Sequence, residues 1–187
     1  LSPTASVKSL IIYMLIRHYL NVIDNNVLII VPTTSLVEQL YKDFKDYGFD
    51  VETNVSRKYH GYDIDEDKRI VISTWQSLYK MPKKFFEDYG AVIGDEAHLF
   101  KAVSLTKIMT KLTDCKYRIG LTGTLDDSKT HKLVLQGLFG MVNKVVSTTE
   151  LIERKQLANL KIKCLNLKYP ETEAKKVYGV KYFEELE

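Results

Sequence analysis

Short apolar runs alternate with amphipathic stretches along this chain, and that alternation limits the folds it can adopt. Apolar runs lie at 27–31, 69–73, 91–94 and 117–121, and each precedes a stretch with helical features. Strands that alternate with helices are typical of a parallel α/β sheet covered on both faces. A chain of 187 residues is long enough for one such domain with a sizeable core, and for the beginning of a second.

The alternation of strands and helices changes near the C-terminal end of the chain. We therefore expect a main α/β domain over residues 1–159 and a terminal strand and linker over residues 160–187. A period-2 run at 160–168 predicts that terminal strand. Two more strands are expected at 51–55 and 142–146, and a surface loop at 56–68. Helices are expected over residues 9–23, 35–47, 76–79, 82–89, 104–112, 130–138 and 148–156.

Composition leaves several classes of function open and excludes few. A net charge of +3 and a pI near 8.7 permit contact with nucleic acid but do not require it. The apolar run 10–16 is too short to cross a bilayer, and no signal cleavage site follows it. Cys115 and Cys164 lack metal-ligand spacing, which predicts two buried, reduced thiols in a reducing compartment such as the cytoplasm.

An apolar run that ends in two adjacent carboxylates is the first candidate site. In Val92-Ile-Gly-Asp-Glu-Ala-His98, Asp95 and Glu96 are expected at the carboxyl end of a buried strand, where ligands bind in open α/β sheets. One acid there can hold a hydrated Mg²⁺ while its neighbour orients or deprotonates a water. The alternative is that both acids cap the following helix.

The opening stretch LSPTASVKSL is the second candidate, because Lys8 and Ser9 suit a triphosphate and its Mg²⁺. Val7 stands where phosphate-binding loops carry glycine. If that position needs a positive φ, a β-branched residue costs ~1–3 kcal/mol, which corresponds to roughly ten- to a hundredfold weaker binding. The alternative is that this stretch matches a phosphate-binding loop by chance and is only the start of a helix. The first residue is Leu, and the motif begins almost at once, so we expect a partial chain. The whole candidate loop comprises Thr4, Ala5, Ser6, Val7, Lys8 and Ser9.

These motifs together resemble a known family. Asp95-Glu-Ala-His98 matches the DEAH box of superfamily 2 helicases, and the opening stretch occupies the place of their motif I. Val31-Pro-Thr-Thr-Ser-Leu36 resembles motif Ia, Ser73-Thr-Trp-Gln-Ser77 is similar to the motif before the DEAH box, and Thr122-Gly-Thr124 is similar to motif III. The flanks LTGTLDDSK and 148–152 look most like the bacteriophage UvsW type of recombination helicase. The resemblance spans nearly the whole chain, but only the first half of such a protein.

The resemblance implies a RecA-like P-loop NTPase domain that uses ATP and Mg²⁺ to unwind or remodel DNA. It implies phosphate binding by Lys8, Mg²⁺ binding by Ser9 and Asp95, and water orientation by Glu96. It also implies a grip on nucleic acid through Thr33, Thr34, Thr74 and Trp75, and coupling through His98, Thr122 and Thr124. Structural alternatives remain open for these residues: a helix N-cap for Thr33, the core for Trp75, a solvent-facing position for His98, and a turn for the last two threonines.

Single-stranded or branched DNA is the partner that the resemblance implies, with RNA also open, and the host cytoplasm the compartment if the chain is viral. A second RecA-like domain would supply arginines, so we expect the 187-residue chain alone to hydrolyse ATP negligibly. Two rivals stand beside this hypothesis. One is a degenerate lobe that binds nucleic acid without ATP turnover, and the other is a double-strand DNA translocase.

Overall fold

A computed structural model describes residues 8–59, 64–65, 67–99, 102–123, 129–144, 147–156, 158 and 163–164 of the chain. The chain divides into two compact units, Leu1–Leu157 and Ala158–Glu187, and the account below concerns the first. Some of the sequence-based expectations fall outside the described residues: the loop residues Thr4, Ala5, Ser6 and Val7, Thr124, and all of the strand at 160–168 except residues 163–164.

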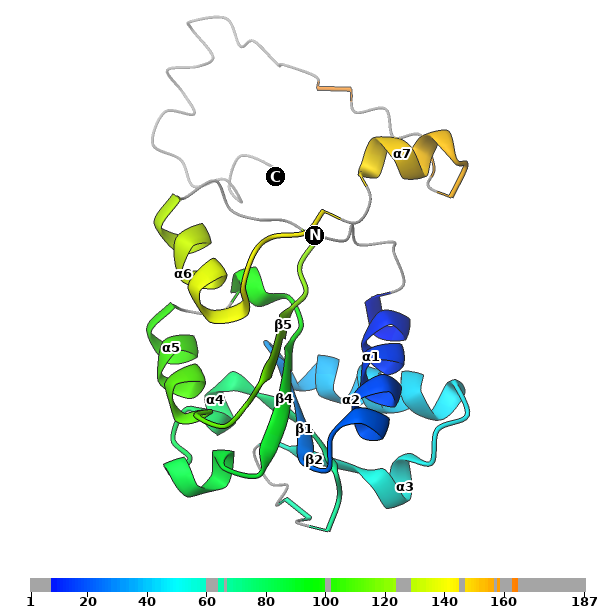
Figure 1. The fold of residues 1–187 in the computed structure, drawn as a ribbon. Helices are drawn as coiled ribbons and strands as arrows, with labels where there is room; N and C mark the ends of the chain where they lie inside the picture. The colour runs from blue at the N-terminus through cyan, green and yellow to red at the C-terminus, as the bar shows by residue number, and fades with distance from the viewer. Residues whose placement is uncertain are drawn as a thin grey trace, which may run out of the picture. The chain divides into compact units, whose positions relative to one another are not determined.

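Five parallel strands form the sheet of the first unit, in the order β2-β3-β1-β4-β5 (Figure 1). The register pairs Ile30 of β1 with Gly94 of β4, and Gly94 with Gly120 of β5. The predicted α/β class is therefore confirmed. The bounds are β1 Asn26–Val31, β2 Val55–Lys58, β3 Ile70–Thr74, β4 Tyr89–Gly94 and β5 Tyr117–Gly120.

Helices cover both faces of this sheet (Figure 1). On one face lie α1 (Lys8–Val22), α2 (Thr34–Asp46) and α3 (Val51–Asn54). On the other lie α4 (Trp75–Leu78), η1 (Lys83–Phe86), η2 (Ala97–Leu99), α5 (Ala102–Lys111) and α6 (Lys129–Phe139). A short helix, α7 (Thr148–Glu153), follows them in sequence. Among the described residues, no helix has the length and apolarity needed to cross a membrane.

The central strands are apolar on both sides, and this splits the core into two clusters. In β1, Val27, Ile29 and Val31 pack toward α1 and α2, whereas Leu28 and Ile30 pack toward α4, η1 and α5. All five residues are fully buried. A continuous apolar run, rather than an alternating one, is what a parallel strand between two helical layers requires.

The structure corrects four expectations about local structure. Residues 51–54 form a helix, not a strand, because the Asp50 side chain accepts a hydrogen bond from Thr53 N and caps it. The strand begins only at Val55, so residues 56–58 of the expected loop belong to the sheet. The helix expected over 82–89 is a single 3₁₀ turn, and Gly90 lies inside β4. Residues 142–144 form no strand.

Arg69 links three segments at the amino edge of the sheet. Its guanidinium donates to the backbone oxygens of Leu20 (3.3 Å), Ile23 (2.6 Å) and Asn25 (3.3 Å), at and just beyond the end of α1. The last carbonyls of a helix lack partners within the helix, and a cation there also suits its dipole. Arg69 therefore stabilises the end of α1 against the start of β3.

We expect Arg69→Ala to lower the free energy of unfolding by about 1–3 kcal/mol, because partly buried carbonyls lose a charged donor. Urea denaturation followed by circular dichroism measures this. Arg17→Ala is the matched control, since Arg17 is exposed on α1 and, within the part of the chain that the structure describes, bonds to the Tyr13 hydroxyl and lies over its ring. Equal, small effects of both changes would contradict the capping role.

The two cysteines differ in exposure, which corrects the expectation that both are buried. Cys115 is buried and Cys164 is exposed. Burial raises the pKa of the Cys115 thiol to about 11, and the nearby Arg118 only partly opposes this effect. The thiolate is the reactive form of cysteine. Cys115 is therefore unreactive toward thiol reagents for two reasons: it is buried, and it stays protonated near neutral pH.

With a colourimetric thiol reagent at pH 8, we therefore expect one equivalent to react rapidly and the second only after denaturation. Cys164→Ser removes the rapid phase and Cys115→Ser removes the slow one. Two rapid equivalents in the native chain would show that Cys115 is accessible.

Candidate functional site

The parallel sheet brings the ends of four strands to one edge, and polar residues follow each of them. Thr33 comes after β1, Thr74 closes β3, Asp95 follows β4 and Thr122 follows β5. These residues are far apart in sequence, and they share an edge because parallel strands end on the same side. Ligands of open α/β sheets bind at this carboxyl edge.

Backbone hydrogen bonds fix the segment that follows β4. Asp95 N donates to Ile30 O (2.9 Å) on one side, while Leu121 N donates to Gly94 O (2.8 Å) on the other. Ala97 N also donates to Leu121 O (2.9 Å). Between these anchors Glu96 has a φ of 48°, in the left-handed region that few residues other than glycine adopt. The surrounding bonds therefore hold Glu96 in a conformation it would not choose freely.

The Glu96 side chain joins α1 to the strand ends. Its Oε1 forms an ion pair with Lys8 Nζ, although the two residues are 88 positions apart. Its Oε2 lies 3.4 Å from His98 Nδ1, and that same nitrogen lies 2.6 Å from Thr122 Oγ1. The Lys8 and Glu96 side chains are only 10% and 22% exposed. Four of the predicted site residues thus form one connected polar network.

Asp95 lies beside this network in surroundings that disfavour its charge. The residue is 6% exposed, and one of its oxygens accepts a hydrogen bond from Glu96 N (3.0 Å). Burial raises the pKa of Asp95, the negative charge of Glu96 raises it further, and Lys8 partly opposes both. A bound cation would relieve this cost, since a carboxylate is favoured by an opposite charge nearby.

A hard cation such as Mg²⁺ fits the donors at this edge, because carboxylate and hydroxyl oxygens are its preferred protein ligands. The part of the chain that the structure describes contains no group of three or more His, Cys, Asp or Glu side chains able to hold a metal alone. Mg²⁺ is commonly held by one or two protein oxygens together with substrate phosphates. The donor set therefore suits a metal that arrives with a phosphate ligand.

Ser9, the other predicted metal ligand, makes a contact that no sequence pattern predicts. Its Oγ lies 2.9 Å from the hydroxyl of Tyr47, which follows the last residue of α2. Tyr47 is part of an aromatic cluster with Tyr13, and their ring centroids are 5.3 Å apart. A lone tyrosine before a glycine carries no motif, so only the packing of α1 on α2 reveals it.

The residues predicted to grip nucleic acid lie at the same edge, with different exposure. Thr33 and Thr34 are exposed, and the Thr33 hydroxyl accepts from Leu36 N (3.3 Å), which confirms the helix-cap interpretation. Thr74 is 4% exposed, and its hydroxyl lies 3.0 Å from Ser77 Oγ. Trp75 is partly buried against the core around α4 and α5, which supports its structural alternative.

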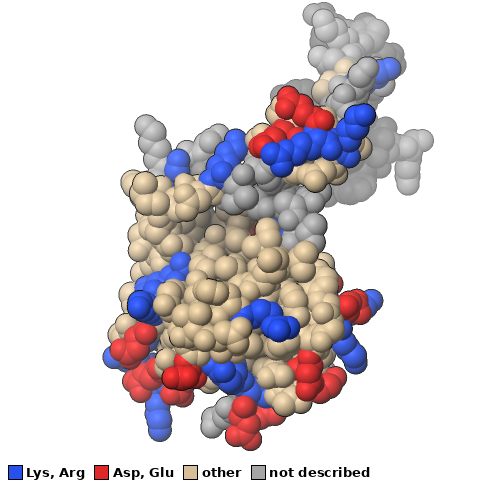
Figure 2. All heavy atoms as spheres, turned by 45° about the vertical axis from the view of Figure 1, so that its right-hand side comes forward, with Lys and Arg blue, Asp and Glu red and all other residues tan. Residues whose placement is uncertain are grey.

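Two further features concern charge. Arg57 lies in the stretch 56–68 that was expected to be a surface loop, but it pairs with Glu38 (2.7 Å) and stacks over the Tyr41 ring at 4.0 Å. The face on the side of α1 and α2 shows few charged side chains near its centre (Figure 2). Leu10, Met14 and Val22 of α1 are exposed apolar residues. This face is therefore a poor surface for a polyanion.

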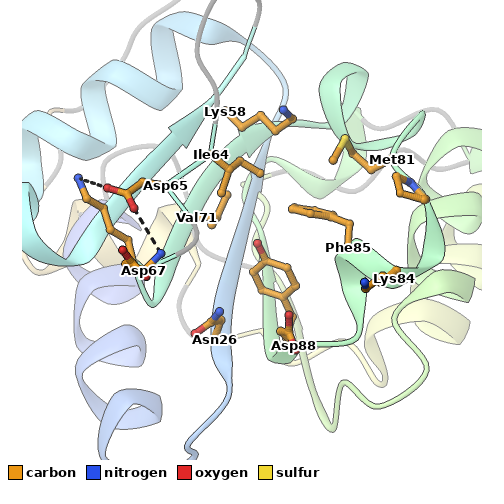
Figure 3. Close-up of a pocket in the computed structure, with 13 residues that line it drawn as sticks. Asn26, Lys58, Ile64, Asp65, Asp67, Val71, Met81, Lys84, Phe85 and Asp88 are labelled. Carbon is orange, nitrogen blue, oxygen red and sulfur yellow. Dashed lines mark hydrogen bonds and ion pairs between the residues drawn. The ribbon is translucent and has the colours of Figure 1, made fainter.

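A separate pocket of about 810 Å³ opens between β2, residues 64–65 and 67–68, and η1 (Figure 3). The Phe85 ring points into it, and Asn26 and Asp88 lie at one end. Three lysines and three aspartates line it, so its walls have no net charge and do not suit a polyphosphate. None of the predicted site residues is among its lining: Asn26, Lys58, Ile64, Asp65, Asp67, Lys68, Val71, Met81, Pro82, Lys84, Phe85, Asp88 and Tyr89.

Comparison with known proteins identifies the family to which this chain belongs. The family model described as "Type III restriction enzyme, res subunit" matches residues 2–127. The ATP-dependent DNA helicase uvsW of Enterobacteria phage T4 is 37% identical over 188 residues, which cover 98% of this chain and 38% of that protein.

Solved structures resemble this chain over almost its whole length. A crystal structure of T4 UvsW has a TM-score of 0.70 at 35% identity, covering 98% of this chain and 36% of that one. The helicase domain of Hef from Pyrococcus furiosus also has a TM-score of 0.70, at 19% identity, and covers 95% of this chain and 41% of that one. At that identity the second likeness concerns the fold alone. This chain spans less than two-fifths of the length of its T4 relative.

We expect Asp95→Asn to raise the free energy of unfolding at pH 7. The pKa of Asp95 is raised in the folded chain, so folding at pH 7 places an ionised carboxylate where the charge is disfavoured. As the pH falls through the raised pKa toward the ordinary value of 3.8, the carboxyl becomes protonated in both states and the gain disappears.

Urea denaturation at pH 7 and at pH 4 measures both effects. Asp88→Asn serves as the control, because Asp88 is exposed and directly precedes β4, at the end of the strand opposite to this edge. A loss of stability at pH 7, or an identical gain at both pH values, would contradict the destabilising role of the buried charge.

Proposed function

We propose that this chain binds Mg²⁺-ATP and DNA as part of an ATP-dependent DNA helicase or translocase. The chain belongs to the Type III restriction enzyme res subunit family and is an N-terminal RecA-like lobe of a superfamily 2 helicase. The observation that carries the proposal is the ion pair between Lys8 and Glu96. It joins the start of α1 to the end of β4, the two elements that carry the phosphate-loop lysine and the DEAH carboxylates.

Lys8 is the proposed phosphate-binding residue. Lys8 is the first residue of α1 as the structure describes it, and the N-terminal N–H groups and dipole of a helix also attract anions. A triphosphate carries more negative charge than one carboxylate, so it competes with Glu96 for Lys8. Mg²⁺, when bound with the nucleotide, would neutralise phosphate oxygens, and Ser9 and Asp95 are the residues proposed to hold it.

Glu96 is the proposed general base or water-orienting group. Once Lys8 turns to a phosphate, the Glu96 carboxylate is free to accept a proton from an attacking water. His98 stays within 3.4 Å of Glu96 and contacts Thr122 at the end of β5. This chain of contacts supports coupling through His98 and Thr122, because a shift of Glu96 changes what lies against the next strand.

DNA is proposed to bind along the carboxyl edge near β1 and β3. Thr34 and Ser35 at the start of α2 are exposed there, so their backbone and hydroxyl donors can reach backbone phosphates. Gln76 also joins the two strand ends, since its Nε2 donates to Pro32 O (3.4 Å). Thr74 and Trp75 would then act mainly by shaping this edge.

Nucleotide hydrolysis is proposed to require more than this lobe. The T4 relative, named an ATP-dependent DNA helicase, is more than twice as long as the matched region. In phosphoryl-transfer enzymes an arginine supplied from another element stabilises the transferred charge. We propose that a second RecA-like domain completes the site in this way, as it would in a motor that closes two lobes over ATP.

The experiment that tests the function is a titration of the 187-residue chain with a fluorescent ATP analogue and Mg²⁺. We expect saturable binding, and a ten- to hundredfold loss in Lys8→Ala, because about 1.5–3 kcal/mol of charge-assisted hydrogen bonding is removed. Lys45→Ala is the matched control, since the Lys45 side chain is 64% exposed on α2. ATP turnover by the chain alone is expected to be negligible.

Three DNA forms, single-stranded, duplex and four-way branched, complete the test in an anisotropy assay. Tightest binding to duplex would favour the double-strand translocase, and tightest binding to the branched form would favour recombination-type processing. If neither the natural chain nor Val7→Gly binds nucleotide while DNA binding persists, the degenerate-lobe rival replaces the proposal.

A further inference from the structure

The hydroxyl of Tyr47 is the only side-chain group that the described residues place in hydrogen-bond contact with Ser9. The two oxygens are 2.9 Å apart, across 38 positions of sequence. Both side chains are partly buried, so the contact is sheltered from water without being sealed from a ligand. A contact of this kind restricts the rotamer of a serine that is otherwise free to turn.

The position of the Tyr47 hydroxyl is set by α2 and its neighbours. Tyr47 N donates to Asp43 O (2.9 Å), and Gly48 follows with a φ of 80°, which lets Phe49 N return to Phe44 O (3.0 Å). The Tyr47 ring also packs against Tyr13 of α1 at 5.3 Å. The hydroxyl is therefore anchored independently of the loop that precedes Lys8.

A serine hydroxyl has one proton and two lone pairs, and metal coordination uses a lone pair. If the proton is donated to a fixed acceptor, the remaining lone pairs have a defined direction. Outer-shell partners of metal ligands act in this way, by orienting the ligand rather than touching the metal. Tyr47 is a phenol that accepts as well as donates, so it meets the requirement.

We propose that Tyr47 is a positioning residue for the nucleotide-bound metal: it accepts a hydrogen bond from the Ser9 hydroxyl and so directs a Ser9 lone pair toward Mg²⁺. The inference rests on the proposed function, because Ser9 is a metal ligand only if the chain binds Mg²⁺-ATP. It assigns to the end of α2 a part in nucleotide binding that no motif in the sequence marks.

The test compares binding of a fluorescent ATP analogue to the 187-residue chain with Mg²⁺ and with EDTA. Tyr47→Phe keeps the ring and removes the hydroxyl. We expect about fivefold weaker binding with Mg²⁺, equivalent to about 1 kcal/mol at 1.4 kcal/mol per tenfold, and no change in EDTA. In a Ser9→Ala background, Tyr47→Phe is expected to have no further effect.

Tyr13→Phe is the matched control, because it removes a hydroxyl from the same aromatic cluster, where the partner is Arg17 rather than Ser9. Thermal unfolding of every variant separates folding from binding. If Tyr47→Phe is unfolded, Tyr47→Trp provides a second ring without the hydroxyl.

Equal weakening with and without Mg²⁺ would overturn the inference, since it would make Tyr47 a structural residue. So would unchanged or tighter Mg²⁺-dependent binding, or an additive loss in the Ser9→Ala background. These results all require that the natural chain binds Mg²⁺-ATP. Absence of Mg²⁺-dependent binding by the natural chain itself would instead refute the proposed function, and this inference with it.

Discussion

The parallel pairing of β1, β4 and β5 is the constraint on which the site depends. Parallel strands need long crossovers, so residues that are distant in sequence return to the same edge of the sheet. In this chain the crossovers place Ile30, Gly94 and Gly120 side by side. The backbone bonds beyond these residues then continue the ladder and hold Asp95 and Glu96 from both sides. An antiparallel arrangement would send half of these strand ends to the opposite edge.

Charge at this edge is disfavoured by the same burial that makes the fold stable. Asp95 is 6% exposed and its pKa is raised, and Glu96 adopts a left-handed φ. Neither feature helps the chain to fold. Both are offset by interactions elsewhere: the apolar residues buried in β1 and β4, and the ion pair with Lys8. Strain and unfavourable charge that persist in this way are typical of functional sites.

The sequence predicted the fold class and most helices and strands, because periodicity and short buried runs report burial directly. It also predicted Lys8, Glu96, His98 and Thr122 as residues of one site, and the structure brings these four side chains into contact. Their roles in chemistry stay predictions. The helix at 51–54 was missed because two valines favoured a strand, whereas the Asp50 cap decided the local conformation.

Other features could not be read from the sequence because they depend on contacts between elements. Arg69 lies in an apolar strand context, yet its function is to bond carbonyls 44–49 positions earlier. Arg57 lies in a polar stretch that is typical of a surface loop, but in the folded chain it forms an ion pair with Glu38 and stacks over the Tyr41 ring. The exposure of Cys164 likewise follows from packing and not from residue type.

Helix α2 connects the two ligands proposed for this lobe. Its first turn carries Thr34 at the edge where DNA is proposed to bind, and its end presents Tyr47 to Ser9. Thirteen helical residues span about 20 Å at 1.5 Å per residue, and a hydrogen-bonded helix moves largely as a rigid body. If a DNA strand shifts the start of α2, the Tyr47 hydroxyl shifts with it, and so does the direction of the Ser9 lone pair. Nucleic acid and nucleotide would then be coupled along α2 as well as through Glu96, His98 and Thr122, because one route ends at Ser9 and the other at Lys8, the adjacent residues proposed to hold Mg²⁺ and phosphate.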